Sequence, residues 1–142
     1  MSGWTNAVEQ GMLNHFMGKA TYTSDANHYV ALSTTPPTET GTNFTEPVGG
    51  AYARKSTVAT DWNSATGGSP SQITNLNAVI FATATAAWGT ITHWGIFSAL
   101  SGGTLRSSGP LASAQIVNSG NIATFAAGAL RVQLGDSTDA YG

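Results

Sequence analysis

The sequence contains no cysteine and few charged residues. Without cysteine, the chain has neither a disulfide framework nor a cysteine-based zinc site. Charged residues make up only 8% of the 142 positions, against roughly 25% in an ordinary soluble domain. We therefore expect a neutral, polar surface. A surface so poor in charge is easier to explain if neighbouring molecules cover much of it.

Positive charge and long apolar runs are lacking as well. The chain has five Lys and Arg residues and a formal net charge of −2, which cannot supply the basic face that nucleic acid requires. No run approaches the roughly 18 consecutive apolar residues of a membrane-spanning helix, so no membrane partner is expected. The N-terminus has no basic region followed by an apolar run. This argues against a signal peptide and predicts that the chain starts in the cytoplasm where it is made.

Residues 1–18 contain the spacing of one amphipathic helix. Trp4, Val8 and Met12 lie four residues apart and would form one stripe on a helix. Thr5 stands just before the periodic segment and is a candidate N-cap. The sequence therefore predicts a short N-terminal helix with one apolar face.

After residue 18 the pattern changes to short apolar segments separated by turn residues, which predicts strands. Nothing divides the chain, so we expect one mainly β domain over residues 1–142, with a C-terminal tail at 135–142. Strands of this kind, with turns about every ten residues, are typical of an antiparallel β-sandwich or jelly-roll-like barrel, here over residues 28–134. The expected strands are residues 28–35, 51–60, 77–84, 89–99, 104–111, 114–118, 122–128 and 130–134.

The acids and histidines do not form a catalytic pattern. A hydrolase needs a nucleophile with its base, or two carboxylates, converging on a pocket. Here most acids lie in expected loops or in the tail, and the three histidines lack metal-ligand spacing. We therefore expect no catalytic residue, no metal and no cofactor. An enzyme such as a polysaccharide depolymerase is the weakest alternative, with Asp25, Glu39 and Glu46 as the acids to test.

The most apolar expected strand, residues 89–99, carries large apolar side chains on both faces. One face has Trp94 and Ile96, and the other has Phe97 and His93. A strand with one face in water would alternate apolar and polar residues. We therefore expect the strand to be central, with the N-terminal helix on one side, or to have one face against another subunit. His93 is interpreted as a half-buried packing residue with one ring nitrogen hydrogen-bonded.

Trp62 lies in a polar loop, residues 61–71, with no obvious place in the core. A large aromatic side chain in a loop can anchor an interface. It can also fold back as a lid on the core, or act as a platform for a sugar. The lid and the interface are the favoured interpretations.

Three segments together resemble a family of small tailed-bacteriophage virion proteins. They are HYVALSTTPPTETGTNFTEPVGGAYARK (28–55), ATAAWGTITHWGIFSALSGGTLRSSGPL (84–111) and VNSGNIATFAAGALRVQL (117–134). The resemblance runs from about Val8 to Leu134 and is specific in order and spacing. The family is commonly labelled tail-fibre or minor structural protein. The resemblance therefore implies a virion component without catalytic residues.

On this basis we expect a capsid decoration, or cement, protein that binds the major capsid protein lattice and stabilises the head. A closed homo-oligomer, with a trimer favoured, fits such a role. The alternative is a tail-fibre or tail/baseplate adaptor protein that contributes to host attachment and touches host glycan through Trp62. The expected contact regions are the helix, the loop at 36–50 and the tail. The candidate interface residues are Trp4, Val8, Met12, Phe44, Trp62, Trp94 and Tyr141.

Overall fold

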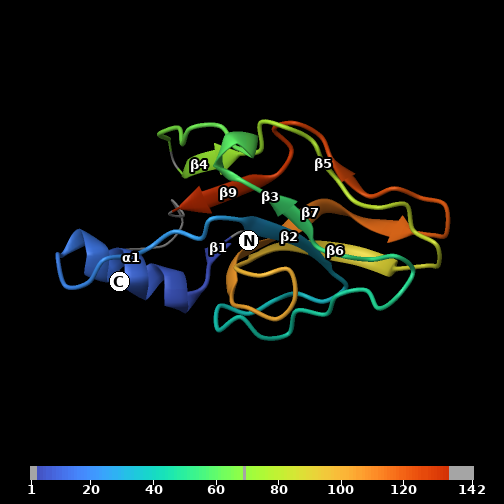
Figure 1. Cartoon of the computed structure of the whole chain (residues 1–142), viewed down its shortest axis with the longest axis horizontal. Helices are drawn as coiled ribbons and strands as arrows, with labels where there is room; N and C mark the ends of the chain where they lie inside the picture. The colour runs from blue at the N-terminus through green and yellow to red at the C-terminus, as the bar shows by residue number, and fades with distance from the viewer. Residues whose placement is uncertain (1–2, 69, 135–142) are drawn as a thin grey trace.

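The computed structural model describes residues 3–68 and 70–134, so the tail with Tyr141 lies outside the described residues. The fold is mainly antiparallel β with one helix near the N-terminus, as the sequence predicts (Figure 1). The elements are β1 (Gly3–Trp4), α1 (Asn6–Phe16), β2 (His28–Ser33), β3 (Lys55–Thr57), the 3-10 turn η1 (Ala59–Asp61), β4 (Ser71–Thr74), β5 (Val79–Ile80), β6 (Gly89–Phe97), β7 (Leu105–Val117), β8 (Thr124–Phe125) and β9 (Arg131–Leu134).

The described strands form two layers. Five of them make one antiparallel sheet in the order β1-β7-β6-β2-β3. The second layer is split into two small sheets, β4–β9 and β5–β8, which run along one side of the large sheet in Figure 1. The main core lies between the layers, where Leu32 and Trp94 of the large sheet pack in one cluster with Val79 and Val132 of the small sheets. Burying these side chains supplies the main driving force for folding.

The central strand β6 is covered on both faces by its own chain. Trp94 and Ile96 belong to the core beneath the small sheets. On the opposite face, Phe97 packs with Leu105, and Phe44 from the loop after β2 closes over them. The prediction of two apolar faces is confirmed. The expectation that the helix covers one of them is wrong, because α1 lies beside the end of the sheet (Figure 1).

Several expected strands are shorter in the structure, and two are joined. The strand expected at 51–60 shrinks to β3, because the chain turns into η1. The segments at 104–111 and 114–118 form the single strand β7. β7 carries extra residues opposite one position of β6. Ile91 of β6 pairs with Gln115 and His93 pairs with Pro110, so the single residue Thr92 lies opposite residues 111–114 of β7. Such an insertion bends a strand and leaves its extra residues without ladder partners.

Two short strands were not expected from the sequence. β1 is two residues long and pairs with β7, so it has no periodicity to detect. β4 begins at the last residue of the polar loop at 61–71 and pairs with β9. Its residues Ser71, Gln72 and Thr74 are polar, and only Ile73 is apolar. Its extended conformation follows from pairing with β9 rather than from local preference.

Candidate assembly surface

Two of the loop carboxylates hold the fold together. Asp25 accepts two hydrogen bonds from the guanidinium of Arg106, at 2.8 and 3.0 Å. Asp61 accepts the backbone N–H of Val58 at 2.9 Å and the side-chain amide of Asn77 at 3.0 Å. Both bonds lower the pKa of Asp61, and the bond from Val58 has the larger effect. Both acids therefore fix a loop in place.

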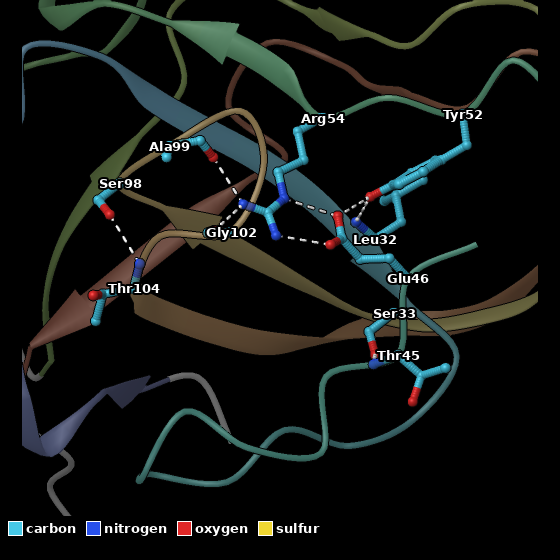
Figure 2. Close-up of polar contacts among 10 residues, drawn as sticks. All are labelled: Leu32, Ser33, Thr45, Glu46, Tyr52, Arg54, Ser98, Ala99, Gly102 and Thr104. Carbon is cyan, nitrogen blue, oxygen red and sulfur yellow. Dashed lines mark hydrogen bonds and ion pairs between the residues drawn. The ribbon is translucent and has the colours of Figure 1, made fainter. Parts of the chain in front are cut away.

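Arg54 is the centre of a polar cluster that ties two loops to the large sheet (Figure 2). Its Nε and Nη2 atoms donate to the two carboxylate oxygens of Glu46, at 2.9 and 2.8 Å. Its Nη1 atom donates to the carbonyls of Ala99 and Gly102, each at 2.7 Å. Because Glu46 lies in the loop after β2 and the carbonyls lie in the β6–β7 hairpin, one side chain joins both. A forked guanidinium suits this task, since it donates in several fixed directions.

Tyr52 extends the cluster into the core. Its hydroxyl donates to Glu46 at 2.8 Å and accepts the backbone N–H of Leu32 at 3.0 Å. Burial, together with the charge of Glu46, raises the pKa of Tyr52 well above its ordinary value. The Arg54 guanidinium lies 3.6 Å from the centre of the Phe97 ring, a cation–π contact. The cluster thus has a structural role: its polar groups are hydrogen-bonded to one another and hold the two loops against the large sheet.

His93 occupies the position that its strand predicts. It is half-buried, and its Nδ1 atom lies 2.8 Å from the hydroxyl of Thr92. Burial lowers the pKa of the imidazole, because a charged ring loses water there. Within the described residues, no three His, Asp or Glu side chains gather as metal ligands would. His93 is therefore placed as a packing residue.

Four of the candidate interface residues meet at one hollow, although they come from distant parts of the chain. Trp4, Val8, Met12 and Trp62 all line a cavity of about 310 Å³ beside α1. We call it the helix-side pocket. Its deeper wall includes buried residues of the large sheet and of β9, among them Ile96. The sequence singled out these residues, but only the fold brings them together.

The two indoles of the pocket are held by their N–H groups. Trp4 donates to the carbonyl of Gln133 at 2.8 Å, and Trp62 donates to the hydroxyl of Thr57 at 3.0 Å. Both rings also pack against the main core. The structure therefore places Trp62 as a lid that folds back on the core, one of the interpretations that the sequence favours.

An apolar face of α1 runs out of this pocket into solvent. Val8, Met12 and Phe16 lie four residues apart on one face, and their exposed fractions rise from 0% through 36% to 83%. Leu13 and Met17 beside them are also exposed. We call Met12, Leu13, Phe16 and Met17 the α1 stripe. Contiguous exposed apolar residues of this kind mark contact surfaces.

The remaining candidate interface residues do not share this surface. Trp94 is only 4% exposed, so its side chain is enclosed by its own chain. Phe44 packs edge-to-face on Phe97, with ring centres 5.0 Å apart. Phe16 belongs to the exposed surface although it is not a candidate interface residue, and its spacing of four residues from Met12 is the sequence signal for it. Helical spacing alone does not say whether an apolar face meets the core or the solvent.

A second hollow lies between β7 and the segment at 121–129. It measures about 740 Å³, and its lining includes Leu111 and Ile116 of β7 together with Ile122 and Phe125. Residues 111–113, which belong to the segment without partners in β6, also line it. An unpaired strand edge can accept a strand from another chain. Nothing in the sequence pattern indicated this groove, because it depends on the bulge in β7.

No helix among the described residues is long and apolar enough to cross a membrane. The fold and these surfaces define a small antiparallel β domain whose hollows are lined largely by apolar side chains. A family model described as podophage GP4 fiber I protein gp80 matches residues 3–133. The chain belongs to this family and is therefore a structural component of a phage virion, as the sequence resemblance implies. No curated protein matches the chain.

Proposed function

We propose that the protein is a subunit of a tail fibre and that it assembles through the end that carries α1. The observation that supports this proposal is the α1 stripe next to an apolar pocket, in a chain whose family is described as a fibre protein. Its partners would be further copies of itself and other virion proteins. The low charge of the chain suits close packing of copies, because like charges do not have to be brought together.

Capsid decoration is the second candidate, and the nearly neutral surface of a small domain favours it. A protein that binds only the assembled lattice stabilises that state by mass action. Many copies spread over the shell would then protect the head. The partner would be the major capsid protein, and a trimer would suit a lattice site of matching symmetry.

Copy number and deletion phenotype separate the two roles. A quantitative gel of purified virions would show a fibre subunit at a small multiple of the tail's symmetry, and a decoration protein at levels near those of the major capsid protein. Virions lacking a fibre subunit should adsorb poorly and keep their heat resistance. Virions lacking a decoration protein should lose resistance to heat and low salt. A high copy number with heat-sensitive mutant heads would overturn the fibre assignment.

We also propose that the role is not enzymatic. Asp25 and Glu46, two of the acids singled out for catalysis, each bind an arginine side chain, and Glu39 lies exposed in a loop. Incubating the purified protein with host polysaccharide should release no new reducing ends. If such ends appear and are lost in an Asp25→Asn or Glu39→Gln variant, the non-enzymatic proposal fails.

A further inference from the structure

We propose that the Phe16 ring of one copy inserts into the helix-side pocket of a second copy. The proposal rests on the fibre-subunit assignment and specifies its self-contact. One molecule carries both halves of the contact, an exposed aromatic ring and an apolar cavity. The occupant of the pocket is therefore a second copy of the same chain.

Phe16 is presented to solvent by a helix end that is held in place. It is the last residue of α1, and the chain reverses just after it at Gly18, which has a positive φ of 69°. Tyr22 then returns along the helix, where its ring packs so closely on Gly11 that a Cβ there would lie 2.6 Å from the ring. The N–H of Tyr22 also donates to His15 Nδ1 at 3.2 Å. Because the backbone that carries the ring is already held, less freedom is lost on binding than for a ring on a mobile segment.

The pocket suits an apolar guest of this size. An apolar cavity of about 150 Å³ already accepts benzene, and the helix-side pocket measures about 310 Å³. Its charged residues, Asp25 and Arg106, already bind one another. Both charges would therefore keep their partner when a phenyl ring enters the pocket. A sugar fits less well, because the apolar wall would leave many of its hydroxyls without hydrogen bonds.

Phe16 does not fill the pocket of its own copy. Met12, one helical turn before it, lines the pocket, but Phe16 does not and its side chain is 83% exposed. In the proposed contact the guest therefore comes from another molecule. The α1 stripe alone would bury much less than the roughly 800 Å² per partner of a stable interface. Filling the pocket adds the apolar burial that contact between two stripes would lack.

α1 carries little charge, so identical chains can come into contact there without strong repulsion. The helix carries one acid, Glu9, and has no Lys or Arg. The contact can be made twice about a twofold axis, with each ring in the other copy's pocket, or once per pair in a head-to-tail arrangement. Repeated around an axis, the head-to-tail contact closes into a ring such as a trimer, and without closure it extends into a filament. Each of these arrangements is compatible with a fibre.

The first test is the mass of the purified full-length protein by light scattering. Wild type should be an oligomer. Phe16→Asp should be a monomer, because it removes the ring, and so should Ser24→Trp, because Ser24 lines the pocket and is exposed. Val48→Asp is the matched control and should stay oligomeric, since Val48 is 96% exposed in a different loop. Circular dichroism shows that each variant is folded.

The second test uses the absence of cysteine. Met17→Cys and Ser24→Cys place one thiol beside Phe16 and one in the pocket, and both variants keep Phe16. When the two proteins are mixed and oxidised, disulfide-linked pairs of one with the other should predominate. Predominance of pairs between two Met17→Cys chains would instead mean that the α1 stripes meet directly and would overturn the proposal.

Two further outcomes also contradict the contact. A monomeric wild type, or a Ser24→Trp variant that stays oligomeric, means that the pocket holds no neighbouring ring. If that variant instead loses binding to host polysaccharide, the pocket is a glycan site. None of these results bears on the copy number or the deletion phenotype. The contact can therefore fail while the fibre assignment stands.

Discussion

At the scale of single residues, two side chains have roles that their surroundings decide. Gly95 lies in β6 beneath the ring of Phe44, and a Cβ at this position would lie 2.5 Å from that ring. Arg54 is almost enclosed, with its side chain 7% exposed. The glycine permits a close approach, and the arginine joins two loops.

Replacing Gly95 with alanine should destabilise the protein. The added methyl group overlaps Phe44 and Leu105, and overpacking of this kind costs about 1–3 kcal/mol. Chemical denaturation measures the loss. Gly67→Ala is the control, because a Cβ there meets nothing within 4 Å. Adding Phe44→Leu to Gly95→Ala should cost less than the sum of the two single changes, and strict additivity would argue against the overlap.

Replacing Arg54 with methionine should cost about 3 kcal/mol, since it leaves Glu46 and two carbonyls without their partner in a mostly buried site. The stability of Arg54→Lys should fall between those of wild type and Arg54→Met, because one ammonium group cannot donate in all the directions of the forked guanidinium. Denaturant titration gives the free energies of unfolding. Arg131→Met, at an exposed position, should change little. Equal stability of the methionine variant and wild type would show that the cluster does not hold the loops.

At the scale of elements, the short turn η1 depends on its own acid. Asp61 closes η1 by accepting the N–H of Val58, and η1 carries the chain from β3 to Trp62 of the helix-side pocket. Three residues of 3-10 helix have few internal bonds to hold them. The carboxylate therefore has a direct effect on where Trp62 lies.

Asp61→Ala should lower the melting temperature at pH 7, and the difference from wild type should shrink in acid. The folded pKa of Asp61 lies below its ordinary 3.8. Its contribution is therefore complete above about pH 4 and is lost as the pH falls through the folded pKa. Melting curves from pH 7 to pH 2 test this, with the exposed neighbour Thr60→Ala as control. A difference that stays constant with pH would contradict the role of the charged form.

At the scale of the whole molecule, local pattern predicted the elements better than their packing. The helix and the central strand were expected at 1–18 and 89–99, and α1 and β6 lie within those limits. Thr5 stands at the N-cap, but its hydroxyl donates to the carbonyl of Leu105 at 2.8 Å rather than capping α1. The short strands β1 and β4 form only because distant partners pair with them.

The sequence by itself determined a neutral, cysteine-free, mainly β chain with an apolar helix face, because composition and periodicity are local properties. The tertiary structure decided which apolar faces are covered. It put Trp94 in the core and left Phe16 in solvent, and it brought Trp4, Met12 and Trp62 to one pocket. The physical reason is that burial depends on which distant segments pack together, and periodicity carries no information about the partner.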